Sequence, residues 1–339
     1  MANYNLDGII DEIEKTTEET TNKLVVNNDP MSLPLWKNEA QNHQKLGGYI
    51  VMECINDINY YQDSPISIQQ AKECLEAVAQ FHASAWEDTE ILKLCEERLS
   101  RGSYHLQTRN PKELQNIQQT WESFQNNFYD YNPTLFDDPT IKDIGSRVQK
   151  LAQYVSDEVS PSYSDRYATI THGDFKSMNC FLPKEEEEEN GRSSCSSSSS
   201  SSSNVLLVDF ASTGVGLGMS DVAMHIHHAV RPEDLANGGE IELVNHYLNV
   251  LEEALLKKKK HGNNTFLYPR DVAMRHYKLC VVDYFRFVVG RFWKTASIEN
   301  FEKQKHNKNV LLANRNVNSA VAFLQRASNY MTEIEQELV

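Results

Sequence analysis

The residues best suited to chemistry lie in the segment 172–179, His-Gly-Asp-Phe-Lys-Ser-Met-Asn, and in the triplet Val-Asp-Phe at 208–210. A carboxylate can orient an attacking hydroxyl and accept its proton, so we predict that Asp174 acts as a general base. Asn179 and Asp209 carry the oxygen ligands that magnesium prefers, and metal ions bridge the phosphates during phosphoryl transfer. The pattern therefore predicts transfer of a phosphoryl group to a hydroxyl.

Two more residues of the first segment are expected to support this chemistry. We expect His172 to brace the loop by hydrogen bonds rather than to take the proton. Lys176 follows Asp174 by two positions and is expected to approach the transferring phosphate as a point charge. The pattern of His, Asp and Asn is short and occurs by chance in unrelated chains. A surface loop with incidental polar residues is therefore the alternative interpretation.

The elements around these residues favour the chemical interpretation. Residues 167–171 predict a strand that delivers the first segment, and residues 180–183 and 205–210 predict a hairpin that ends at Asp209. The intervening residues 184–204 are rich in Glu and Ser, cannot bury a core and are expected to form a disordered insertion at the hairpin tip. Glycines at 214, 216 and 218 are expected to let the following loop turn.

The rest of the chain predicts helices, which makes the expected fold mainly helical with a small β component. Ser67 and Gln70 form a capping-box pattern at the start of a helix over 65–86. His82 ends the apolar stripe of this helix; we expect a core histidine bonded to a backbone carbonyl, with a catalytic histidine as the alternative. Apolar spacing predicts further helices over 91–99, 111–129, 140–159, 219–230, 233–260, 269–293 and 309–339. Core packing is expected for the aromatic residues Trp121, Phe124, Phe128 and Tyr131.

Composition excludes several classes of protein. The formal charge is −15, and the only run of lysines is the four at 257–260, so nucleic acid is not an expected partner. The six cysteines form no metal-binding or disulfide pattern, and His225, His227 and His228 are not spaced to share one helix face. The N-terminus lacks a signal-peptide pattern and the most apolar helix carries four charges, which predicts a cytoplasmic protein without membrane contact. The oligomeric state stays open.

Five short segments also resemble a known group of enzymes. They are residues 172–179, 208–210, 220–223 (Ser-Asp-Val-Ala), 49–53 (Tyr-Ile-Val-Met-Glu) and 79–83 (Ala-Gln-Phe-His-Ala). The chain resembles the aminoglycoside phosphotransferase and choline kinase-like family, and within it the CHK or ecdysteroid kinase-like branch. The resemblance implies an α+β, protein-kinase-like fold, ATP and Mg²⁺ as cofactors, and a small hydroxylated molecule as substrate.

Position by position, the resemblance implies a role for each matching residue. It makes Asp174 the catalytic base, gives the metal to Asn179 and Asp209, and has Asp221 brace the catalytic loop from the following helix. It places three residues in the hinge that contacts adenine: Met52, Glu53 and Cys54.

The first part of the chain departs from the pattern of such kinases. No glycine-rich loop is evident, and Lys23 and Glu39 are the best candidates for the strand lysine and its partner. We therefore expect residues 1–55 to form a truncated or degenerate small lobe with the hinge strand, and residues 56–339 to form a helical catalytic lobe. The predicted function is an ATP-dependent kinase for a choline-, sugar- or steroid-like acceptor. A catalytically inactive pseudokinase or small-molecule-binding protein is the alternative, and a protein kinase ranks below both.

Overall fold

The computed structural model of the protein describes residues 55, 57–99, 106, 111–184, 205–258 and 268–338. The chain divides into two compact units, 1–58 and 59–339, and the fold described below is that of the second unit. Several predictions lie wholly or almost wholly outside the described residues: the hinge strand at 49–55, the insertion at 184–204, and the roles of Lys23, Glu39, Met52, Glu53 and Cys54.

Two small antiparallel sheets carry the strands. In the first, β1 (Tyr60–Tyr61), β3 (Cys180–Pro183) and β4 (Leu206–Leu207) lie in the order β1-β3-β4. Cys180 pairs with Leu207 and Phe181 with Leu206, which confirms the predicted hairpin. Its second strand is shorter than expected, because the backbone turns into a left-handed conformation at Asp209.

The second sheet corrects the prediction made for the glycines. It pairs β2 (Ala168–Thr171) with β5 (Gly214–Leu217), and Thr169 and Thr171 lie opposite Gly216 and Gly214. The expected turn at these glycines is therefore wrong: two of them belong to a strand, and Gly218 begins the next helix. Alternate glycines leave one face of a strand without side chains, which permits close approach of neighbouring backbone.

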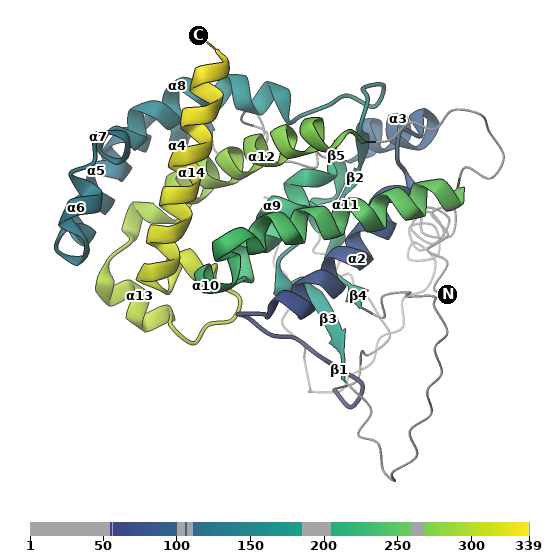
Figure 1. The fold of residues 1–339 in the computed structure, drawn as a ribbon, viewed down its shortest axis with the longest axis horizontal. Coiled ribbons are helices and arrows are strands. Elements are labelled where there is room, and N and C mark those ends of the chain that lie inside the picture. The colour runs from purple at the N-terminus through teal and green to yellow at the C-terminus, as the bar shows by residue number, and fades with distance from the viewer. Residues whose placement is uncertain are drawn as a thin grey trace, which may run out of the picture. The chain divides into compact units, whose positions relative to one another are not determined.

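Helices make up most of the described unit (Figure 1). They are α2 (Ile68–Ser84), α3 (Thr89–Arg98), α4 (Pro111–Gln115), α5 (Ile117–Phe128), α6 (Pro133–Phe136), α7 (Pro139–Lys142), α8 (Ile144–Glu158), α9 (Gly218–Ala229), α10 (Pro232–Leu235), α11 (Gly239–Lys258), α12 (Arg270–Arg291), α13 (Ile298–Gln304) and α14 (Val317–Glu337). Short 3-10 turns connect them: η1 (Tyr129–Tyr131), η2 (Ser177–Asn179), η3 (Phe210–Ser212), η4 (Ala236–Gly238), η5 (Trp293–Thr295) and η6 (Leu312–Asn314).

Three of the predicted helices are interrupted. The 111–129 helix breaks at Asn116 and the 140–159 helix at Asp143, whose backbones are not helical. The 233–260 helix breaks at Asn237, which has a positive φ of 52°. The expected C-terminal helix starts only at Val317, where Asn316 caps it by accepting a hydrogen bond from the backbone of Ser319. The Asn316 side chain bonds the backbone, which favours a helix start there over continued helix; Asn116 and Asp143 make no such bond within the described residues.

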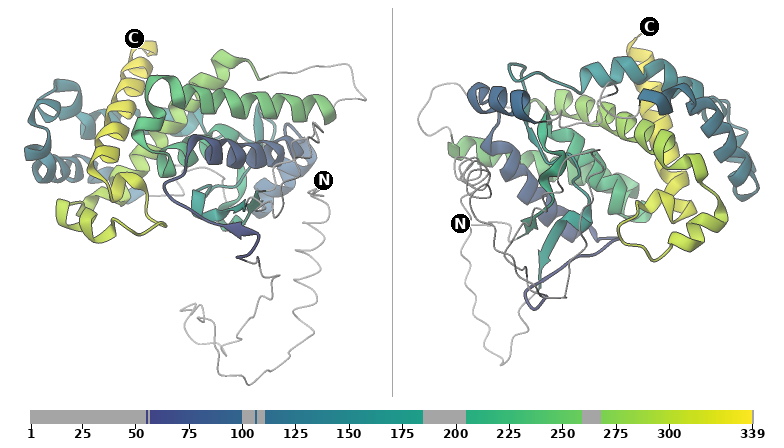
Figure 2. Two further views of the ribbon diagram at one scale, coloured as in Figure 1. Left: turned by 60° about the horizontal axis from the view of Figure 1, so that its bottom comes forward. Right: turned by 180° about the vertical axis from the view of Figure 1, so that it is seen from behind.

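Helix α2 packs against α11 and also contacts α9 and the strands β2, β3 and β4. The predicted capping box is present: Ser67 Oγ accepts from the backbone of Gln70, and Gln70 Oε1 accepts from the backbone of Ser67 at 2.7 Å. Figure 2 shows α2 between α11 and the strands. This placement brings the end of α2 close to both β2 and α9.

The aromatic core lies around α5 and the end of α12. Trp121, Phe124 and Phe128 are buried as predicted, and Phe124 stacks on Trp293 with ring centroids 4.0 Å apart. Tyr131 does not join them. Its side chain is exposed and its hydroxyl donates to Asn318, because the chain leaves α5 at η1 before this position.

Among the helices that the structure describes, none has the length and apolar run needed to cross a bilayer.

Candidate active site

The segment 172–179 leaves β2 as a tight loop supported by α9. Gly173 has a φ of +76°, and its backbone N–H donates to Asp221 Oδ1 at 2.9 Å. The backbone N–H of His172 donates to Asp221 Oδ2 at 2.7 Å. Asp221 lies in the first turn of α9 and is 1% exposed. A buried carboxylate therefore holds two consecutive amides of the loop.

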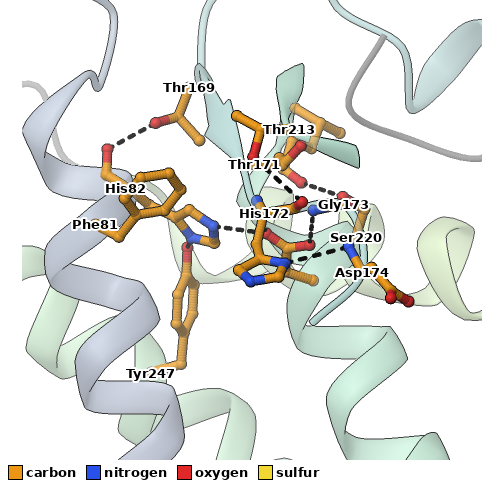
Figure 3. A network of polar contacts seen from close by, with 12 residues as sticks. Phe81, His82, Thr169, Thr171, His172, Gly173, Asp174, Thr213, Ser220 and Tyr247 are labelled. Carbon is orange, nitrogen blue, oxygen red and sulfur yellow. Dashed lines mark hydrogen bonds and ion pairs between the residues drawn. The ribbon is translucent and has the colours of Figure 1, made fainter. Parts of the chain in front are cut away.

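Asp174 sits on the open side of this loop. Its side chain is 29% exposed, and Figure 3 shows the carboxylate directed away from His82 and Tyr247. Oδ2 accepts hydrogen bonds from Lys176 Nζ at 3.0 Å and from Asn179 Nδ2 at 3.1 Å. The structure thus brings together three of the residues that the sequence singled out. In this arrangement the Lys176 ammonium forms an ion pair with the Asp174 carboxylate.

His172 is held by both of its ring nitrogens. Nε2 lies 2.9 Å from the carbonyl oxygen of Val208 and must donate to it, because a carbonyl only accepts. Nδ1 then accepts from the backbone N–H of Asp174 at 3.3 Å. The ring links the loop to the residue before Asp209. These are the contacts expected of a bracing residue, and the bracing role itself stays a prediction.

Val208 links the chain next to Asp209 with Asn179. Its backbone N–H donates to the carbonyl oxygen of Asn179 at 3.0 Å, which fixes the end of β4 against the segment 172–179. The Asn179 amide uses its Nδ2 for Asp174, so its Oδ1 stays available. Asp209 is exposed and has a φ of 64°, and its carboxylate makes no hydrogen bond or ion pair with the described residues.

The two oxygen groups are a suitable donor set for Mg²⁺, because hard oxygen ligands are the ones this ion takes. Asp209 also holds a left-handed backbone, which costs energy in a residue that carries a Cβ. Such conformations gather at functional sites, where surrounding contacts enforce them. The roles of Asn179 and Asp209 as metal ligands remain a proposal.

His82 is buried as predicted, but its partners differ from those expected. The ring is 0% exposed and makes no bond to a backbone carbonyl within the described part of the chain. Nε2 lies 3.0 Å from Asp221 Oδ2, and Nδ1 lies 2.8 Å from the hydroxyl of Tyr247. The prediction failed because the ring points from the end of α2 toward α9 and α11. Tyr247 carries no signal in the sequence that marks it as part of this site.

Comparison with known proteins places these residues in a family. The model of the ecdysteroid kinase-like family matches residues 36–260, about two-thirds of the chain. The chain belongs to the ecdysteroid kinase-like family. The match spans the catalytic loop, Asp209 and Asp221, and also His82 and Tyr247. No curated protein matches the sequence as a relative.

Membership of the ecdysteroid kinase-like family confirms the predicted resemblance and the kinase-like α+β fold with a helical large lobe. It also supports a kinase-like activity at the level of the family.

Three histidines of this ecdysteroid kinase-like protein are neighbours on α9 and face different surroundings. His225 stacks on Phe175 with ring centroids 4.5 Å apart, and His227 Nε2 lies 3.3 Å from the hydroxyl of Tyr277. Burial, with the charge of Lys176 adding to it, lowers the pKa of His228 to about 3. Within the residues that the structure describes, no three His, Cys, Asp or Glu side chains gather as a metal site.

Gly173 allows a direct test of the loop conformation. A Cβ at this position would lie 2.0 Å from the carbonyl oxygen of Ser212, in addition to the strain of a positive φ. We expect Gly173→Ala to lower the free energy of unfolding by about 2–5 kcal/mol, through strain and overlap together. Urea denaturation measures this change.

Gly238 provides the matched control in the same chain. Its φ is +98°, but a Cβ there would meet no atom within 4 Å. Gly238→Ala should therefore cost only the conformational penalty, about 1–2 kcal/mol. Equal losses in the two variants would show that the backbone of Ser212 does not restrict the catalytic loop.

Proposed function

We propose that this member of the ecdysteroid kinase-like family is an ATP-dependent kinase that transfers the γ-phosphate to a hydroxyl of a small molecule. One observation carries the proposal: a partly exposed Asp174 lies beside Asn179, and the backbone of Val208, the residue before the exposed Asp209, is bonded to the carbonyl of Asn179. A base and two oxygen ligands are thereby gathered at one end of the two sheets. Choline-, sugar- and steroid-like alcohols all fit this chemistry.

Each of these residues has a separate role in phosphoryl transfer. Asp174 orients the acceptor hydroxyl and accepts its proton as the hydroxyl oxygen attacks the γ-phosphorus of ATP, whose bond to the bridging oxygen breaks so that ADP leaves. Asn179 Oδ1 and the Asp209 carboxylate would hold Mg²⁺, which would neutralise charge on the phosphates. Lys176 exchanges its contact with Asp174 for one with the transferring phosphate.

Two groups of residues complete the proposal. Asp221 and His172 keep the loop in place through the hydrogen bonds described above. We assign the adenine contacts to the hinge residues Met52, Glu53 and Cys54, on the basis of family resemblance alone.

The second candidate is a small-molecule-binding protein without transfer activity. It is favoured by residues 1–48, whose only glycines, Gly8 and the pair Gly47-Gly48, form no glycine-rich loop. Thermal-shift titration of the full chain separates the candidates. Saturation with ATP and Mg²⁺ at about 100 times Kd should stabilise a nucleotide-binding protein by about 2.7 kcal/mol. Absence of a shift would favour the second candidate.

Transfer itself is tested with the full chain, ATP, Mg²⁺ and a panel of small alcohols. We expect Asp209→Asn to raise the Mg²⁺ concentration needed for half-maximal turnover about ten-fold or more, because a direct anionic ligand is lost. Asp130→Asn, at an exposed position on η1, is the control and should leave the Mg²⁺ dependence unchanged. An unchanged Mg²⁺ dependence in Asp209→Asn would remove Asp209 from the metal site.

A further inference from the structure

A chain of three buried side chains runs from α11 to the catalytic loop. Tyr247 on α11 and His82 on α2 are both 0% exposed, and Asp221 on α9 is 1% exposed. The hydroxyl of Tyr247 lies 2.8 Å from His82 Nδ1, and His82 Nε2 lies 3.0 Å from Asp221 Oδ2 (Figure 3). Asp221 in turn holds the amides of His172 and Gly173.

The hydrogen-bonding capacity of each group fixes where the protons lie. The Asp221 carboxylate accepts from two backbone amides, so the atom of His82 that faces it must be a donor, which puts the ring proton on Nε2. Burial, with the charge of Asp221 adding to it, raises the pKa of Tyr247 well above its ordinary value, so this residue keeps its hydroxyl proton. That proton has one acceptor among the described residues, the lone pair of His82 Nδ1.

The contact between Tyr247 and His82 is tightly packed on the side of α9. A Cβ on Gly218, the first residue of α9, would lie 2.4 Å from the hydroxyl oxygen of Tyr247 and 2.6 Å from His82 Nδ1. The α9 backbone thus covers the contact between the two rings. Both rings are also fully buried, so solvent does not reach the contact.

We propose that Tyr247 is a positioning residue: its hydroxyl donates to Nδ1 and so holds the His82 ring against Asp221, in the tautomer that Asp221 sets with the proton on Nε2. This tautomer lets Asp221 accept three hydrogen bonds and so hold the loop that presents Asp174. If the proton moved to Nδ1, the lone pair of Nε2 would face the Asp221 carboxylate and repel it. A buried acid that orients a histidine in this way determines activity in other enzymes through the tautomer alone. The kinetic consequence rests on the proposed kinase function, whereas the tautomer itself does not.

Nuclear magnetic resonance of the ¹⁵N-histidine-labelled full chain directly reports which ring nitrogen of His82 carries the proton. We expect His82 to show a protonated Nε2 and an unprotonated Nδ1, with its resonances identified by their loss in His82→Gln. If that variant does not fold, the comparison with Tyr247→Phe identifies the same ring. In Tyr247→Phe we expect Nε2 to stay protonated, because Asp221 still faces it, and the Nδ1 resonance to shift because its hydrogen bond is lost. A His82 ring protonated on Nδ1 in the wild type, or an Nδ1 resonance unchanged in Tyr247→Phe, would overturn the proposal.

Kinetics and amide exchange test the consequence for the loop. Tyr247→Phe should lower kcat about 3- to 10-fold with an unchanged KM for ATP, the size expected for one buried hydrogen bond. The exchange of the His172 and Gly173 amides should rise by a similar factor. Amide exchange needs no activity, so it separates failure of this proposal from failure of the kinase assignment: unchanged exchange overturns the proposal even in an inactive protein.

Tyr277→Phe is the matched control. Tyr277 is also 0% exposed, and its hydroxyl donates to Glu240 at 2.9 Å, outside the chain of contacts that reaches the loop. This variant should lose a comparable amount of stability without a change in kcat or in exchange of the loop amides. An equal loss of kcat in both variants would assign the effect of Tyr247 to general destabilisation and overturn the proposal.

Discussion

Replacing Asp174 with Asn should lower kcat for phosphate transfer about 10²- to 10⁴-fold and leave the KM for ATP near the wild-type value. The amide has the size of the carboxylate and keeps one oxygen that can accept from Asn179 Nδ2, so the loop should keep its conformation. It cannot take the proton of the acceptor hydroxyl. The loss should therefore appear in kcat rather than in nucleotide binding.

The charge beside Asp174 strengthens this prediction. Lys176 Nζ lies 3.0 Å from the carboxylate, and the contact becomes one between a cation and a neutral amide in the variant. Lys176 should then turn more freely to the phosphates. ATP binding should therefore be kept while turnover falls. Steady-state kinetics with an alcohol from the panel measure both quantities, and Asp130→Asn serves as the control. Turnover unchanged in Asp174→Asn would end the assignment of the base.

Replacing Asp221 with Ala should lower the free energy of unfolding by about 3–5 kcal/mol. The change leaves three buried donors without an acceptor: the amides of His172 and Gly173 and Nε2 of His82. Each unpaired buried donor costs about 1–3 kcal/mol. Activity should fall as well, because the loop that carries Asp174 loses its two backbone anchors.

Two further variants serve as comparisons for Asp221→Ala. Asp221→Asn keeps one acceptor oxygen and should lose less stability than the alanine variant. Glu252→Ala removes a surface ion pair with Arg270, whose side chains are 39% and 42% exposed, and should cost at most about 1 kcal/mol. Urea denaturation measures all three variants. A loss in Asp221→Ala no larger than that in Glu252→Ala would show that the carboxylate does not hold the loop.

Features that depend on neighbouring residues could be predicted from the sequence. The capping box of Ser67 and Gln70 joins residues three positions apart and forms as expected. The strand before His172 and the hairpin that leads to Asp209 follow from β-branched and apolar runs, and both are present. Errors arose where a local signal had two meanings: the glycines at 214 and 216 suggest a turn, and pairing with β2 makes them a strand.

The site also combines features of neighbouring residues with contacts between distant ones. The sequence by itself determined the chemical groups, because Asp174, Lys176 and Asn179 lie within six residues and meet through a single loop. Family resemblance implied that Asp221 braces that loop, and only the tertiary structure decided which side chains support Asp221. His82 meets Asp221 across 139 positions and Tyr247 across 165. Contacts over such separations depend on how α2, α9 and α11 pack. Apolar periodicity specifies which face of each helix is buried but not which polar groups meet there, so this support could not be predicted from the sequence.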